Sequence, residues 1–254
     1  MEIYALQLVL FLLLFLRCTA IIALAPILGH VSVPVQVKAA LGVFMAFVLY
    51  PLLAAKNPQI DMQLMGLAML AAQEILTGLL IGFAMGLMFA GVRAAGELIG
   101  FDLGLSLATA FDPDTGTNNL VGEFLYLVVL LVFLLMNGHH FVLQALVLSY
   151  DAVPLGGFAV RGAAAEGLVS LTGVVFMVAL ECAAPVIVAS FLVNLALAIL
   201  SRVAPQINVL MVSFSLKIGV GLVVLMIAGP FLVYAFKNLL AGFEEDVLQL
   251  IRVM

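Results

Sequence analysis

The sequence predicts an all-α integral membrane protein, built from about six long apolar helices that form kinked hairpins. Hydrophobic residues make up 66% of the chain and charged residues only 9%, and the mean hydropathy is +1.34, whereas soluble domains carry roughly 25% charged residues. The few charges are scattered singly rather than gathered in a patch, so a nucleic-acid-binding protein is excluded.

Six apolar segments are long enough to cross a bilayer, which takes about twenty residues per helix. They are residues 6–26, 38–55, 64–92, 124–149, 168–200 and 209–240. Several exceed one crossing, which tilt, kinking or a packing environment other than lipid would accommodate. Basic residues fall equally on the two sides of such a six-span topology, so the positive-inside rule assigns no orientation.

The first segment contains Arg17 and ends at Pro26. The chain start lacks the basic region of a signal peptide, so we expect a retained helix. Pro26 and Pro34 forbid a continuous helix, and the chain should turn and re-enter at Val35 or Lys38. An arginine at mid-span is costly unless it snorkels to a boundary or pairs with another group, and the sequence leaves both possibilities open for Arg17.

Glycines recur at every fourth position in two stretches. They are Gly78, Gly82 and Gly86, and then Gly96, Gly100 and Gly104. On a helix this spacing makes a smooth face that another backbone can approach, so we expect tight helix packing at both stretches. Glu74 lies just before the first of them, near the start of an apolar segment. A position at the membrane interface is favoured there over a role as a proton-relay carboxylate.

A turn-rich stretch interrupts the apolar sequence after the second set of glycines. Within it, Asp112-Pro113-Asp114-Thr115-Gly116 combines a proline that sets φ, aspartates that bond to backbone donors and a glycine free to take positive φ. Irregular backbone is tolerated inside a membrane only where protein buries it or where it lines a water-filled cavity. The stretch is therefore either a surface connection or the lining of such a cavity.

The fourth segment contains Asn137-Gly138-His139-His140. Adjacent histidines on a helix point about 100° apart and cannot easily share a metal, unlike the i, i+4 pair of zinc motifs. We therefore interpret Asn137-Gly138 as a break or packing point. The sequence contains no His-Glu-x-x-His, Walker or nucleophile-elbow motif, which indicates a protein other than an enzyme.

The last third of the chain predicts a helical hairpin. Pro185 and Pro230 lie within its two arms and should kink both. Arg202 and Lys217 place positive charge at its tip. Glu181 is expected to be a buried acid, either protonated or hydrogen-bonded, because an unpaired carboxylate in an apolar arm is costly.

The order of motifs along nearly the whole chain resembles one family, the FliR family of type III secretion export-gate proteins. The hairpin carries Arg202-Val203-Ala204-Pro205-Gln206-Ile207-Asn208, followed by Phe214 and Lys217. Upstream, the matching residues are Arg17, Pro26, Gly29, Pro34, Pro51, Gly104-x-Ser106-x-Ala108-Thr109-x-x-Asp112-Pro113, Asn137-Gly138-His139, Ser149, Pro154 and Gly156. The hairpin is also similar to FliQ, a small two-helix gate subunit.

The resemblance implies a non-enzymatic subunit, without cofactor or metal, of a helical export gate in the bacterial inner membrane and flagellar basal body. It implies FliP, FliQ and FlhB as partners, with unfolded flagellar polypeptides as cargo and membrane lipid around the gate. Residues 1–165 would form a FliP-like part and residues 166–254 the FliQ-like hairpin. Two alternatives stay open: a proton-coupled secondary transporter that uses Glu74 or Glu181, and the equivalent subunit of a virulence type III system.

The resemblance also implies roles for individual residues. The loop at 104–122 would be a plug that seals the closed pore, with Gly104, Ser106, Thr109, Phe111, Asp112, Pro113 and Gly116. The hairpin would be an assembly surface, with Glu181, Pro185, Arg202, Pro205, Gln206, Asn208, Lys217 and Pro230. The residues expected at close helix contacts are Gly78, Gly82, Gly86, Gly96 and Gly100.

Overall fold

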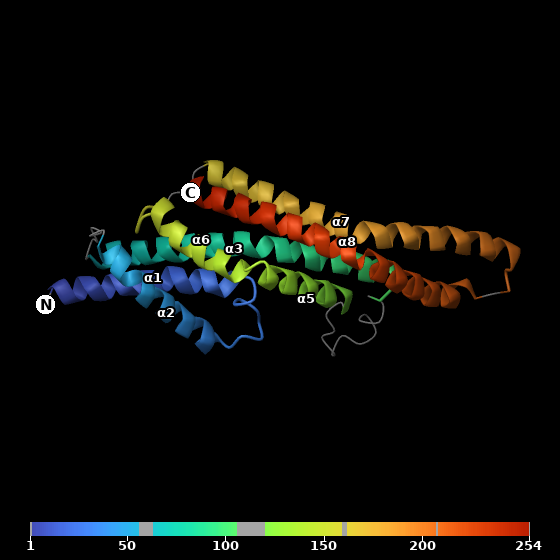
Figure 1. Ribbon diagram of the computed structural model, residues 1–254, viewed down its shortest axis with the longest axis horizontal. Coiled ribbons are helices and arrows are strands. Elements are labelled where there is room, and N and C mark those ends of the chain that lie inside the picture. Colours follow the sequence, from blue (N-terminus) through green and yellow to red (C-terminus); the bar gives the residue numbers. More distant parts are fainter. Residues whose placement is uncertain (1, 56–62, 106–119, 159–161, 207, 254) are drawn as a thin grey trace. The chain divides into compact units, whose positions relative to one another are not determined.

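The computed structural model describes residues 2–55, 63–105, 120–158, 162–206 and 208–253, and all regular secondary structure within them is helical (Figure 1). The helices are α1 (Glu2–Leu24), α2 (Val35–Ala54), α3 (Leu64–Asp102), α5 (Leu120–Leu135), α6 (Gly138–Ala152), α7 (Gly162–Val203) and α8 (Val209–Val253). Five of the described helices are long and apolar enough to cross a membrane, or up to six spans if the bent pair α5 and α6 counts as one. The predicted fold class, an all-α integral membrane protein, is confirmed.

Three helices are longer than the sequence predicts. α3, α7 and α8 contain 39, 42 and 45 residues, so at 1.5 Å per residue each is roughly twice as long as the hydrocarbon core of about 30 Å. α3 continues because Ala95 and Ile99 extend its buried face. α8 continues because Phe243, Val247 and Leu250 recur at helical spacing and are buried.

A sharp bend separates α5 from α6. Their axes differ by 71°, and Asn137 between them has a φ of 61°, a left-handed conformation that asparagine tolerates better than most residues. The backbone oxygen of Asn137 accepts a hydrogen bond from His140 N at 2.8 Å, which starts the first turn of α6. The break predicted at Asn137-Gly138 is confirmed.

The chain packs into two compact units. The first comprises residues 1–87, 137–172 and 241–254, and the second comprises residues 88–136 and 173–240. In the first unit α1 and α2 form a hairpin, and Lys38 Nζ donates a hydrogen bond to the oxygen of Gly29 at 2.8 Å. The start of α7 packs against the end of α8. A Cβ placed at Gly167 would lie 2.8 Å from Leu250 Cδ1, which shows how close the two helices are.

The second unit contains the rest of α3, all of α5 and most of the α7–α8 hairpin. Gly91 of α3 faces the backbone of α7, where a Cβ would lie 3.0 Å from the oxygen of Val175. Both α7 and α8 stay helical through Pro185 and Pro230, and the kinks expected at these prolines stay a prediction.

Candidate functional site

A buried ion pair links α1 to α3 within the first unit. Arg17 Nε lies 2.6 Å from Glu74 Oε2, and Arg17 Nη2 lies 3.0 Å from Glu74 Oε1. This two-bonded arrangement matches the planar guanidinium to the carboxylate and is the strongest form of such a pair. Arg17 is 0% exposed and Glu74 is 1% exposed, so protein groups must satisfy the remaining polar atoms.

The end of α6 supplies most of those groups. Arg17 Nη1 donates to the backbone oxygens of Ser149 at 3.0 Å and Val153 at 2.9 Å. The Ser149 oxygen also accepts a hydrogen bond from Val153 N at 2.9 Å. Carbonyls at a helix C-terminus carry partial negative charge, so a guanidinium there is favourable. Gly156 N donates to Glu74 Oε1 at 3.2 Å from the following turn. One arginine therefore joins α1, α3 and the end of α6.

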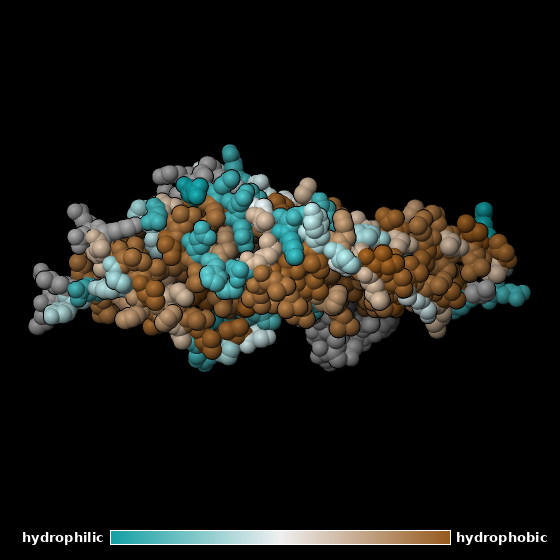
Figure 2. Space-filling view, in the orientation of Figure 1, coloured by the Kyte–Doolittle hydropathy of each residue, from teal (hydrophilic) through white to brown (hydrophobic). Residues whose placement is uncertain are grey.

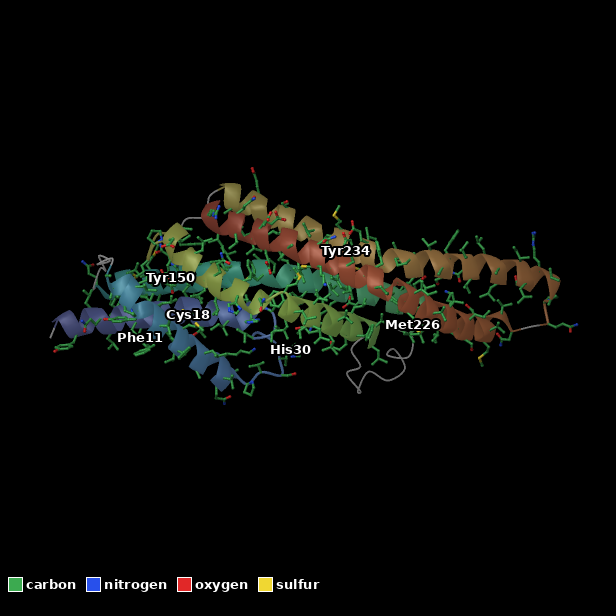
Figure 3. All side chains as sticks on the ribbon, in the orientation of Figure 1. Phe11, Cys18, His30, Tyr150, Met226 and Tyr234 are labelled. Carbon is green, nitrogen blue, oxygen red and sulfur yellow. The ribbon has the colours of Figure 1, made fainter. Side chains whose placement is uncertain are left out.

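Tyr150 completes this cluster from the side of α6. The Arg17 guanidinium carbon lies 4.3 Å from the centre of the Tyr150 ring, a distance suited to a cation–π contact. The Tyr150 hydroxyl donates to the oxygen of Leu14 at 3.3 Å, and it lies 3.9 Å from Cys18 Sγ (Figure 3). The site is a buried polar cluster, and within the described ranges no three His, Cys, Asp or Glu side chains are grouped for a metal.

These contacts decide one of the two expectations about charged residues. Glu74 was expected at the membrane interface; its side chain is buried against Arg17, and its depth in a membrane stays a prediction. For Arg17 the sequence left snorkelling and pairing open, and the structure shows pairing. The sequence did contain a signal for this ion pair, since Arg17 and Glu74 are isolated charges of opposite sign within apolar segments. Pairing them costs less free energy than burying two separate charges.

The first glycine stretch lies against α1 near this cluster. A Cβ at Gly78 would lie 2.8 Å from the oxygen of Arg17, and one at Gly82 would lie 3.0 Å from the oxygen of Ile21. At Gly86 the nearest atom is the oxygen of Leu24, at 3.5 Å. The small residues let α3 approach the backbone of α1 closely enough for Glu74 to reach Arg17.

The second glycine stretch leads to the residues assigned to the plug. Gly96 and Gly100 of α3 are buried. Gly104 follows α3 with a φ of 78°, which favours glycine, and a Cβ there would lie 2.7 Å from the ring of Phe214. The other plug residues lie outside the described part of the chain. They are Ser106, Thr109, Phe111, Asp112, Pro113 and Gly116.

The α7–α8 hairpin exposes much of its apolar surface. Only 22% of the most apolar window of α7 and 17% of that of α8 is buried within the chain, against 61% for α3. The exposed residues include Phe191, Ile199, Met211, Met226, Ile227 and Phe231. Figure 2 shows this apolar surface, and Met226 is labelled in Figure 3. A surface of this kind requires lipid or partner chains to cover it.

The burial predicted for Glu181 is wrong within this chain, since its side chain is exposed. The buried face of α7 runs through Val178, Cys182 and Val186. Glu181 is three residues after Val178 but one before Cys182, which turns it about 100° away from the centre of that face.

At the tip of the hairpin the assigned residues are mostly exposed. Arg202, Pro205, Gln206 and Asn208 are exposed, and Lys217 is half-buried. Asn208 precedes α8 and its Oδ1 accepts a hydrogen bond from Met211 N at 3.4 Å, so it acts as the N-cap of that helix. In the two arms, Pro185 is half-buried and Pro230 is exposed.

Comparison with known proteins decides the family. A family model described as "Bacterial export proteins, family 1" matches residues 8–243. The chain belongs to this family. Flagellar biosynthetic protein FliR of Escherichia coli (strain K12) is 36% identical over 240 residues, covering 91% of each chain. The protein of the same name from Bacillus subtilis (strain 168) is 32% identical, covering 96% of this chain and 95% of its own.

The region shared with the export-protein family includes the candidate sites. Residues 8–243 contain the Arg17–Glu74 cluster, both glycine stretches and the hairpin tip. The flagellar biosynthetic protein FliR of Pectobacterium carotovorum subsp. carotovorum is 35% identical, and the match covers 85% of this chain and 82% of that protein. The similarity to these relatives therefore extends over most of the chain and is not limited to one segment.

Proposed function

We propose that the chain is a non-enzymatic subunit of the flagellar type III protein export gate, in the bacterial inner membrane at the flagellar basal body. With FliP and FliQ it would form the channel through which unfolded flagellar polypeptides leave the cell, and FlhB would bind to this assembly. Residues 1–165 would be the FliP-like part and residues 166–254 the FliQ-like hairpin. Membership of the export-protein family over residues 8–243 supports this assignment.

The observation that carries the proposal is the uncovered hairpin. α7 and α8 are roughly twice the length needed for one crossing, and most of their apolar surface faces away from the chain itself. Helices of this kind fit a multi-subunit assembly in which neighbouring chains bury the remaining surface. A secondary transporter is less well supported, because Glu74 is held by two bonds to Arg17 and Glu181 is exposed.

The hairpin tip gives the test of assembly. Replacing Gln206 by leucine is expected to lower the amount of FliP and FliQ that copurifies with the tagged chain from detergent. The exposed amide of Gln206 would bond to polar groups of a neighbouring subunit, and a partner group left buried without its bond costs about 1–3 kcal/mol. Affinity purification from cells that express the three proteins together measures the effect.

Asn208 supplies a matched control because it also caps α8. Asn208→Ser keeps a capping oxygen but removes the amide, so it should reduce complex recovery without weakening the helix start. Undiminished recovery and normal motility in Gln206→Leu would reject the tip as an assembly surface. A wild-type chain that purifies alone from these cells would reject the export-gate function itself.

In this proposal the plug of the closed channel is the segment at 104–122, whose last three residues, from Leu120, belong to the first turn of α5. A channel wide enough for an unfolded polypeptide leaks ions unless something fills it. Deleting residues 110–116 is therefore expected to leave the subunit assembled and to make cells that overproduce the gate permeable to small ions and solutes. Uptake of a small membrane-impermeant solute, compared at equal amounts of assembled complex, measures the leak.

The point variant Phe111→Ser tests the role of apolar bulk in the same loop. It keeps the chain length and should give a leak between those of the wild type and the deletion. A deletion variant that assembles and is no more permeable than the wild type would show that the loop is only a connection.

A further inference from the structure

The end of α3 and the start of α5 form an antiparallel helix pair inside the second unit. Three contacts occur in order along it: Phe89 with Phe133, Arg93 with Tyr126, and Gly96 with Gly122. The partner number rises as the α3 number falls, which is the register of two antiparallel helices. The contacts recur at steps of four and three residues on α3 and of seven and four residues on α5, which are one or two helical turns, so each helix uses one continuous face.

The contact nearest to residue 105 is made by backbone alone. A Cβ at Gly96 would lie 2.5 Å from Gly122 N and 3.0 Å from the carbonyl carbon of Val121. The two helices therefore touch main chain to main chain, which only glycine allows. Glycine has no side chain that could interlock with the facing helix, so Gly96 gives closeness but little resistance to sliding or spreading.

One turn further along, Arg93 and Tyr126 supply that resistance. The Arg93 guanidinium carbon lies 4.1 Å from the centre of the Tyr126 ring. Tyr126 is 5% exposed, and its ring meets Phe89 edge-on, with ring centres 5.9 Å apart. Phe89 also contacts Phe133 edge-on at 5.4 Å. A buried ring fixed from one side by another aromatic presents a stationary face to the cation.

We propose that the Arg93–Tyr126 contact is a clamp that sets the spacing of Leu105 and Leu120, the described residues on either side of the 106–119 segment. Arg93 and Tyr126 are then positioning residues for Leu105 and Leu120, acting through α3 and α5. The end on the α3 side is held further by Leu103, which packs on Gly221, and by Gly104, which lies on the Phe214 ring.

The position of Arg93 supports this role. It is a charged residue of an apolar helix, and such a residue is retained at a cost in free energy unless its charge is used. The guanidinium head is flat and weakly hydrated, so it can lie on an aromatic face where an ammonium group fits less well. Arg93 is exposed, and its guanidinium lies over the buried Tyr126 ring.

Spin labels test the clamp directly. Leu105→Cys and Leu120→Cys, in a background with Cys18→Ala and Cys182→Ala, allow the distance between the two labels to be measured by pulsed electron resonance in the purified full chain. We expect one narrow distance distribution with Arg93 present. In Arg93→Met the population at longer distances should rise about two- to fivefold, the factor that loss of a cation–π contact at an exposed site would give.

Matched variants separate the clamp from general stability. Tyr126→Phe keeps the ring and should stay nearer to the wild type than Tyr126→Leu, which should behave as Arg93→Met. Arg93→Lys should lie between the wild type and Arg93→Met. Arg252→Met, at an exposed arginine near the end of α8, should leave the distribution unchanged. A narrow distribution in both Arg93→Met and Tyr126→Leu overturns the proposal, and a distribution in Tyr126→Phe as broad as that in Tyr126→Leu overturns the assignment to the ring face.

A second measurement links the clamp to the channel and rests on the proposed function. At equal amounts of assembled gate, Arg93→Met should raise permeability to small solutes, whereas a structural defect alone would lower the amount of assembled gate. A leak in the 110–116 deletion without one in Arg93→Met would reject the clamp but leave the plug. Failure of the wild type to assemble with FliP and FliQ would reject the function and leave the distance result valid.

Discussion

Replacing Arg17 by methionine is expected to destabilise the folded chain by about 3–5 kcal/mol, because it leaves a buried carboxylate without its counter-charge. The variant loses two hydrogen bonds to the Glu74 carboxylate and two hydrogen bonds to the backbone oxygens of Ser149 and Val153. The measurement is the midpoint temperature for loss of monodisperse protein in detergent, together with the amount inserted in membranes.

Double substitution is the control for this prediction. Replacing a buried ion pair by apolar side chains of similar size is often neutral, whereas removing one partner is not. Arg17→Met with Glu74→Met should therefore recover part of the stability lost in Arg17→Met. Arg17→Lys should fall short of the wild type, since lysine lacks the planar fork that serves four acceptors here. Equal stability of Arg17→Met and the wild type would show that the pair does not hold α1, α3 and α6 together.

Substituting Gly96 by valine is expected to be the second most damaging single change. The smaller Gly96→Ala change already places a methyl group 2.5 Å from Gly122 N. Because the obstructing atoms are backbone, α3 and α5 would have to move apart, and overpacking of this kind costs typically about 1–3 kcal/mol. Valine adds two further carbons and should exceed the alanine variant in the same thermal measurement.

Gly242→Ala is a control for which the expected change in stability has the opposite sign. Gly242 lies in α8 with no atom within 4 Å of a Cβ placed there, so Gly242→Ala should stabilise the helix by about 0.5–1 kcal/mol. If Gly96→Ala also raised the midpoint temperature, the backbone contact between α3 and α5 would not be a constraint on packing.

Local chemistry in the sequence predicted several features that the structure contains. Hydrophobic composition set the membrane class, because no soluble fold could cover so much apolar surface. Pro26 and Pro34 placed the turn between α1 and α2, and Asn137-Gly138 placed the bend between α5 and α6. These features depend on neighbouring residues alone, since φ restriction and helix breaking act within a few positions.

Pairings between distant residues were decided only by the tertiary structure. Glu74 lies 57 positions from Arg17, and an apolar segment gives no register that would bring the two together. The face on which Glu181 lies could not be read from α7, because apolar residues surround that helix and leave no polar side to contrast. The sequence by itself determined that this protein is a helical membrane protein of one export family and where its helices must break. Only the packing of the helices determined which of its few charges are buried and paired. Such contacts depend on how far each helix is rotated and how deep it lies. Hydrophobic periodicity does not encode rotation or depth when a helix is apolar on every side.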